Sequence, residues 1–256
     1  MTEPYDHGLT RPAATRSAGD RDGRHGRIRV LIVDDHVAVR AGLAGLITGQ
    51  PDMTLAGEAS SAVAAVAGGR CSCDVAIVDY HLGDRNGLWV TRRLRQWQAP
   101  PQVLLYSAFA GEALAVAAIV AGAAGLLGKS AIGEEVCLAV RRLAAGGRYL
   151  PVIRPAVLEL IGSRLQADQR AILGLLVHGI PPDEAAAQLG LSTLELDVER
   201  AAILGALVRV PAHSRGFALA SSPLHYDRRR TNFPTDDRRR DTINHGAGDA
   251  GTGGIT

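Results

Sequence analysis

Five short apolar runs, each followed by a helical stretch, constrain the fold of this chain more than any other feature. The runs begin near residues 28, 53, 74, 102 and 124. The helical stretches begin after Asp35 and then cover about 60–69, 87–97, 111–121 and 132–145. This alternation is typical of repeating βα units. We therefore predict an α/β fold, with a five-stranded, doubly wound parallel sheet in the strand order 2-1-3-4-5.

Polar groups stand where four of these runs end. Asp34 and Asp35 follow the first run and Asp79 ends the third. Ser107 ends the fourth run, and Lys129, the only lysine in the chain, follows the fifth. In such sheets ligands bind outside the carboxyl ends of the strands, at the crevice where the strand order reverses. We therefore expect these side chains to meet in one place.

The residue types in this crevice predict a metal and phosphoryl chemistry. Three neighbouring carboxylates repel one another, and a hard divalent cation such as Mg²⁺ removes the conflict. Asp79 could then attack a phosphoryl donor, while Lys129 and the Ser107 hydroxyl neutralise the new phosphate. The alternative is that the terminal acids only cap the helices that follow them. Capping explains Asp35 alone but not four coordinated positions.

Composition narrows the class of protein. A length of 256 residues suggests one to two domains, and 46% apolar residues suffice for a core. The net charge of +2 by itself implies neither nucleic acid nor membrane. The spacing of Cys71, Cys73 and Cys137 lacks a second pair, which favours reduced thiols over a zinc site. The longest apolar run, 113–127, is shorter than the roughly 20 residues of a membrane span, so we expect a soluble, cytoplasmic protein.

Changes in composition divide the chain into segments. Gly146-Gly147 and two following prolines, Pro151 and Pro155, indicate a linker between two domains. The predicted segments are a disordered N-terminal segment at 1–27, the α/β domain at 28–145, the linker at 146–163, a small all-α domain at 164–210 and a disordered Arg/Gly-rich tail at 211–256.

The motifs around the polar groups are specific in sequence and spacing. They are Val30-Leu-Ile-Val-Asp-Asp-His36, Val39-Arg-Ala-Gly-Leu43, Ile77-Val-Asp79, Gly87-Leu88, Tyr106-Ser-Ala108 and Gly122-Ala-Ala-Gly-Leu-Leu-Gly-Lys-Ser130. Together they resemble the receiver domains of two-component response regulators, in particular the NarL/FixJ group. The resemblance covers residues 28–145 and implies a flavodoxin-like receiver fold.

The resemblance also implies a role for each residue of the crevice. Asp34 and Asp35 would bind Mg²⁺ together with Asp79, and the backbone carbonyl of His81 would complete the metal site. Asp79 would accept the phosphoryl group from a sensor histidine kinase. Ser107 would be the switch hydroxyl, and Lys129 would pair with the phosphate.

Two positions depart from the pattern of that family. Gly83 stands where the family usually has a proline, and Leu126 stands where it has an aromatic switch residue. The phosphorylation chemistry needs neither residue. By the resemblance, the coupling of Ser107 to the surface near the fourth helix would depend on that ring, so Leu126 would affect the output.

Residues 164–208 resemble the LuxR-type helix-turn-helix of the same group, which implies binding to promoter DNA. The first helix would include 171–177, Pro182 would open the second, and the recognition helix would begin at Thr193. We expect Leu196, Ile203, Leu204 and Leu207 to face inward. The predicted DNA-contacting residues are Thr193, Glu195, Asp197 and Arg200.

The charge of this segment opposes DNA binding. Residues 164–210 carry six acidic and four basic side chains, a net charge of −2, whereas DNA affinity depends on neutralising phosphates. Acidic side chains near a helix N-terminus can instead stabilise the helix by interacting with the positive end of its dipole. The arginine tracts at 228–230 and 238–240 could add charge toward DNA, or they could belong to a solvated tail.

These observations lead to one hypothesis and two rivals. The hypothesis is a response regulator of a two-component phosphorelay, phosphorylated on Asp79, that controls transcription through its helix-turn-helix; homodimerisation is compatible with it. The first rival is a phospho-switch that acts through a protein partner or dimerisation, with DNA binding lost. The second is a phosphatase with an aspartate nucleophile, but Asp34-Asp35 and Asp79-Tyr80 lack its usual Asp-x-Asp pattern. We therefore expect no enzymatic activity beyond slow self-dephosphorylation.

Overall fold

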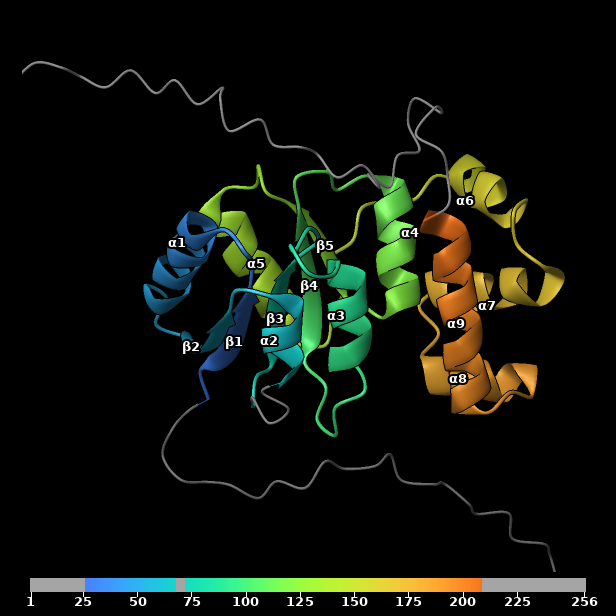
Figure 1. The fold of residues 1–256 in the computed structure, drawn as a ribbon, viewed down its shortest axis with the longest axis horizontal. Helices are drawn as coiled ribbons and strands as arrows, with labels where there is room; N and C mark the ends of the chain where they lie inside the picture. The colour runs from blue at the N-terminus through green and yellow to red at the C-terminus, as the bar shows by residue number, and fades with distance from the viewer. Residues whose placement is uncertain (1–25, 68–71, 209–256) are drawn as a thin grey trace, which may run out of the picture. The chain divides into compact units, whose positions relative to one another are not determined.

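The computed structural model describes residues 26–67 and 72–208. Within these ranges the elements alternate as the sequence predicts (Figure 1). The strands are β1 (Ile28–Val33), β2 (Met53–Ala59), β3 (Val75–Asp79), β4 (Gln102–Ser107) and β5 (Gly125–Gly128). The helices of this part are α1 (Val37–Thr48), α2 (Ala62–Ala67), α3 (Gly87–Leu94), α4 (Glu112–Ala121) and α5 (Gly133–Ala144).

The five strands form one parallel sheet in the order β2-β1-β3-β4-β5, which confirms the predicted fold class and strand order. Val33 of β1 is paired with Val78 of β3, and Asp79 with Tyr106 of β4. This register aligns the carboxyl ends of the central strands. Side chains that follow or end these strands therefore lie at one edge of the sheet.

Both faces of the sheet are covered by helices, so the central strand β3 is buried along its whole length and β4 nearly so. On one face, Val30, Ile32 and Ile77 pack with residues of α1 and α5. On the other face, Leu31 and Val78 pack with residues of α2, α3 and α4. Successive strand residues point to opposite faces, which explains why adjacent positions belong to different clusters.

Four further helices follow the sheet: α6 (Pro155–Gly162), α7 (Ala167–Val177), α8 (Pro182–Leu189) and α9 (Thr193–Val208). Pro182 is in the first turn of α8, and the left-handed Gly190 ends it before α9 begins. The four α9 residues expected to face inward are all buried. The segment at 146–163, predicted as a linker, contains α6, because Pro155 starts a helix there.

Several sequence features lie outside the described residues. They are Cys71, the arginine tracts at 228–230 and 238–240, the tail at 211–256 and the N-terminal segment up to residue 25. Cys73 and Cys137 are described, and both are buried. Across 26–67 and 72–208, no helix combines the length and apolar character needed to cross a membrane.

Candidate functional site

The ends of β1, β3 and β5 bring two acids and the lysine together. Asp34 and Asp79 are buried, with 1% and 2% of their surface exposed. Lys129 Nζ lies 2.8 Å from Asp34 Oδ2 and 2.8 Å from Asp79 Oδ2. With Asp35, which follows Asp34, these side chains form what we call the carboxylate crevice. Two buried carboxylates thus share one cation.

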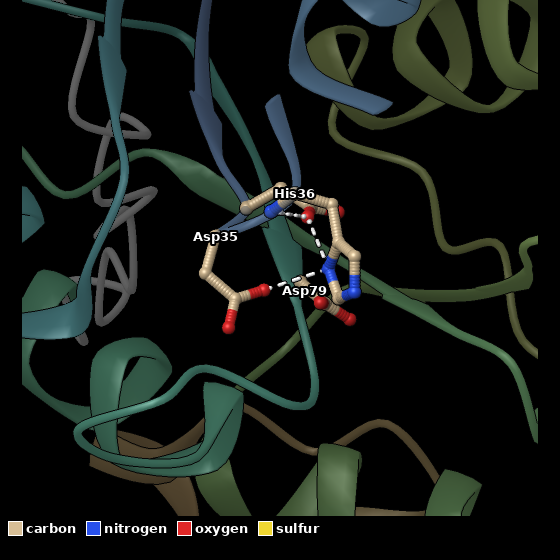
Figure 2. A group of neighbouring side chains, drawn as sticks. Asp35, His36 and Asp79 are labelled. Atoms are coloured by element: carbon tan, nitrogen blue, oxygen red, sulfur yellow. Dashed lines mark hydrogen bonds and ion pairs between the residues drawn. The ribbon is translucent and has the colours of Figure 1, made fainter. Parts of the chain in front are cut away.

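His36 joins the carboxylate crevice, although sequence reasoning did not assign it a role. Its Nδ1 lies 2.7 Å from Asp35 Oδ1 and 3.2 Å from Asp34 Oδ1 (Figure 2). Its backbone N–H donates a hydrogen bond of 2.8 Å to Asp34 Oδ1. One potential ligand atom from each of Asp34, Asp35, His36 and Asp79 lies within 4.8 Å of the others. The grouping is close enough for a single metal ion.

Burial and neighbouring charges shift the pKa values of Asp79 and Lys129 in the carboxylate crevice. Burial raises the pKa of Asp79; Lys129 opposes this shift and the charge of Asp34 reinforces it. Burial alone lowers the pKa of Lys129, but its contacts with Asp34 and Asp79 outweigh burial and raise that pKa overall. Lys129 therefore stays charged at neutral pH and opposes the effect of burial on the pKa of Asp79.

The donor set fits a hard divalent cation. Asp35 Oδ1 and Asp79 Oδ2 are buried oxygens that accept no hydrogen bond from the described residues; their close contacts are the ion pairs with His36 and Lys129. Carboxylate oxygens are ligands that Mg²⁺ and Ca²⁺ prefer. The crevice is thus compatible with a divalent metal. The predicted role of the His81 carbonyl as a ligand stays a prediction; the His81 N–H donates to Asp79 Oδ1 at 3.3 Å.

The loop after Asp79 is held by two residues to which the sequence analysis assigned no role. Asn86 caps α3 by accepting the Trp89 N–H at 3.0 Å. A Cβ on Gly87 would lie 2.4 Å from the Asp79 carbonyl oxygen, so only glycine fits this close approach. The sequence indicates a helix start at Asn86 and Gly87, but it does not show that these residues pack behind Asp79.

Ser107 is fully buried at the end of β4, and its hydroxyl bonds within its own loop. The hydroxyl donates to the Phe109 carbonyl and accepts from the Phe109 N–H, both at 3.2 Å. Beside it, the ring of Tyr106 lies 5.8 Å from Lys129 Nζ, a cation–π distance. Leu126, at the position where the resemblance leads one to expect an aromatic residue, is buried in β5.

The four predicted DNA-contacting residues lie on α9, and the structure gives three of them partners inside the protein. Glu195 Oε2 accepts from the backbone N–H and the hydroxyl of Ser192, at 2.8 and 2.7 Å. Asp197 pairs with Arg200 at 2.9 Å, and Arg200 is only 7% exposed. Thr193 is exposed at the first position of the helix.

The exposed side of α9 carries two apolar side chains in its first half, beside the exposed Thr193 and Glu195. Leu194 and Val198, one helical turn apart, are 74% and 60% exposed. The arginine that sequence reasoning assigned to this surface points into the protein instead. In this conformation, the described part of α9 therefore presents apolar side chains, and no exposed cation, to the solvent.

The chain is similar in sequence to several known proteins. The response regulator receiver domain family matches residues 30–141. The transcriptional regulatory protein UhpA of Salmonella typhimurium is 34% identical over 69% of this chain and 90% of its own length. The DNA-binding transcriptional activator DevR/DosR of Mycobacterium tuberculosis is 31% identical over 64% of this chain and 81% of its own. A LuxR-family two-component response regulator from Aurantimonas sp. SI85-9A1 gives a TM-score of 0.46 at 31% identity, covering 52% of this chain and 94% of that one.

Proposed function

Because the chain belongs to the NarL/FixJ-type response regulators, we propose that it regulates transcription under the control of phosphorylation at Asp79. The choice of Asp79 as the phosphorylated residue rests on one observation. Asp79 is a buried carboxylate at a strand end, 2.8 Å from the Lys129 ammonium and beside two further acids. A carboxylate in such a place can accept a phosphoryl group whose new charge the lysine then balances.

The proposed reaction is a single displacement at phosphorus. A carboxylate oxygen of Asp79 forms a P–O bond as the bond from phosphorus to the donor nitrogen of a kinase phosphohistidine breaks, and the imidazole leaves with the bond electrons. Lys129 pairs with the transferred group. Asp34, Asp35 and Asp79 would hold Mg²⁺, which supplies charge neutralisation to the phosphoryl oxygens. A sensor histidine kinase is the expected donor.

Intact-mass measurement tests this chemistry. The full-length protein, incubated with a small acyl phosphate and Mg²⁺, should gain the mass of one phosphoryl group. Asp79→Asn should not gain it, and chelation of Mg²⁺ should prevent the gain in the wild type. Unchanged mass of the wild type with Mg²⁺ present would refute Asp79 as the acceptor.

For the output, we propose that α8 and α9 contact promoter DNA. The relative DevR/DosR is named as a DNA-binding transcriptional activator, which supports this proposal. A second candidate is that α9 contacts a protein instead. The exposed Leu194 and Val198, without an exposed cation beside them on α9, favour this candidate. A gel-shift assay at low salt, with and without acyl phosphate, separates the two, because only DNA contact produces a salt-sensitive shift.

A further inference from the structure

Helix α4 is buried along nearly its whole length. Every residue from Ala113 to Ala121 is buried, and none of them has a polar side chain. One side of α4 packs toward the sheet and α3, and other residues contact α7 and α9. An amphipathic surface helix would keep a polar side for water. The sequence of α4 therefore suits a helix that is covered on both sides by the rest of this chain.

Arg200 of α9 is bonded to the carboxyl end of α4. Its Nε donates a hydrogen bond of 2.7 Å to the Val120 carbonyl. The residue four positions on, Ala124, donates its N–H to Val103 of β4 instead. The Val120 carbonyl is thus one of the helix-end carbonyls that need a partner from outside, and a cation there also suits the helix dipole.

The surroundings of Arg200 are shaped to this contact. Gly122 ends α4 in the left-handed conformation, with φ of +95°, and a Cβ there would lie 2.8 Å from Arg200 Nη2. Asp197 pairs with Arg200 Nη1 at 2.9 Å, so the charge is compensated where it is buried. From α3, Arg92 Nη2 donates to the Asp197 carbonyl at 3.3 Å.

The amino end of α4 is bonded to the helices that follow the sheet as well. Glu112, in the first turn of α4, accepts from the backbone N–H and from Nε of Arg154, at 2.8 and 2.6 Å. Arg154 is the N-cap residue of α6. Both ends of α4 are therefore joined by charged hydrogen bonds to the C-terminal helices.

We propose that α4 is bonded at both of its ends to the C-terminal helices, an arrangement that we call the tether. In this proposal Arg200 is the positioning residue that transmits the phosphorylation state of Asp79 to α9. The path begins at the loop between β4 and α4, where the Ser107 hydroxyl bonds Phe109, three residues before Glu112. A phosphoryl group on Asp79 offers Ser107 a stronger, charged acceptor than the Phe109 carbonyl. Movement of this loop shifts α4, and the bond from Arg200 carries the shift to α9. This route needs no aromatic residue at Leu126.

The part of this proposal that concerns phosphorylation rests on the proposed function, whereas the tether itself does not. Hydrogen–deuterium exchange on the full-length protein tests both. In the unphosphorylated protein, Arg200→Gln should speed exchange about tenfold in the last turn of α4 and in α9, as expected for loss of a charged hydrogen bond. Exchange in β1 and β3 should not change. The tether is wrong if α4 and α9 exchange in this variant as in the wild type.

Arg170→Gln is a matched control, because it removes the same kind of arginine-to-carbonyl hydrogen bond from a place that does not join α4 to the C-terminal helices. Arg170 Nη1, in α7, donates to the carbonyl of Leu165, in the connection between α6 and α7, at 2.7 Å, so this hydrogen bond does not involve α4. Arg170→Gln should leave exchange in α4 unchanged. If Arg200→Gln fails to fold by circular dichroism, Glu112→Gln replaces it and should speed exchange in the first turn of α4 and at the start of α6; unchanged exchange there overturns the tether.

Phosphorylation supplies the test of transmission. After phosphate uptake has been verified by intact mass, wild-type α4 and α9 should exchange faster, and Arg200→Gln should show the change in α4 but not in α9. Arg200→Lys, which keeps the charge, should restore part of the response. Normal phosphate uptake with no change in α9 overturns transmission but leaves the proposed function standing. Failure of phosphate uptake overturns the proposed function and the transmission with it, while the unphosphorylated comparison still decides the tether.

Discussion

The carboxylate crevice and α9 are both marked in the sequence by charged residues, yet their charges are available to different degrees. In the crevice, Asp35 Oδ1 and Asp79 Oδ2 lie in ion pairs with His36 and Lys129 but accept no hydrogen bond from the described residues. On α9, Glu195 is bonded to Ser192, and Arg200 is bonded to Val120. A group with unfilled acceptor positions can bind a ligand directly, whereas a bonded group must first lose a partner. Residue type alone does not distinguish these two situations.

The largest expected effect comes from removing the cation of the crevice. Lys129→Met should lower the free energy of unfolding by about 3 kcal/mol at pH 7 without divalent ions, because Asp34 and Asp79 remain as neighbouring buried charges. Urea denaturation measures this loss. Mg²⁺ should restore part of it, since a metal ion can replace the lysine as the counter-charge.

Arg141→Met is the matched control for this variant. Arg141 pairs with Asp52 at 2.7 Å, and about two fifths of each side chain is exposed. The loss should stay below about 1 kcal/mol, because solvent screens such pairs, and Mg²⁺ should not restore it. Equal stability of Lys129→Met and wild type in the absence of Mg²⁺ would contradict the crevice as a site of concentrated charge.

A somewhat smaller effect is expected from filling the space behind Asp79. Gly87→Ala should lower stability by about 2 kcal/mol, because the new Cβ meets the Asp79 carbonyl oxygen and a methyl group of Leu105. Gly45→Ala, in α1, is the control, since nothing lies within 4 Å of its Cβ position. It should raise stability by about 0.5–1 kcal/mol. Thermal unfolding of both variants decides the matter; a stable Gly87→Ala would mean that the loop relaxes freely.

The sequence predicted the crevice well for a physical reason. The strand order and the residues at the strand ends follow from short apolar runs of regular spacing, which local sequence encodes. Asp34, Asp79 and Lys129 could therefore be assigned to one place before their distances were known. His36 was missed because its role depends on the direction of one side chain rather than on a pattern.

The sequence predicted the scaffold of α9 but not the use of its polar groups. Leu196 and Ile203 follow helical periodicity, and both are buried as expected. Arg200 was assigned to DNA because its helix resembles the recognition helix of a LuxR-type domain. Its partner is the backbone carbonyl of Val120, 80 residues away, and a carbonyl leaves no trace in the sequence.

Lysines introduced on α9 test whether charges that are available on this helix contact DNA. Leu194→Lys and Val198→Lys place ammonium groups on exposed positions, so stability should change by no more than about 0.5 kcal/mol. If α9 faces DNA, each lysine should steepen the slope of log affinity against log salt by roughly 1. Val63→Lys, an exposed apolar position in α2, is the control. Unchanged salt dependence in the α9 variants would favour the protein-contacting candidate.

The smallest effect is expected at Asp84, a charged residue near the crevice whose acceptor positions are filled. Asp84 accepts from the backbone N–H groups of Ala62 and Val63, both at 2.9 Å, at the start of α2. These hydrogen bonds hold the pKa of Asp84 below its ordinary value. A carboxyl group whose pKa is lower in the folded state stabilises the protein above its unfolded pKa, about 4, and loses that contribution as the pH falls through the folded value.

The stability difference between wild type and Asp84→Ala should therefore be constant from about pH 5 to pH 8 and shrink below about pH 4. Asp84→Asn keeps one acceptor oxygen without the charge, so it should lie between the two at neutral pH and converge with wild type in acid. Urea midpoints across the pH range measure all three proteins. A difference that persists unchanged in acid would mean that Asp84 acts through packing rather than through its charge.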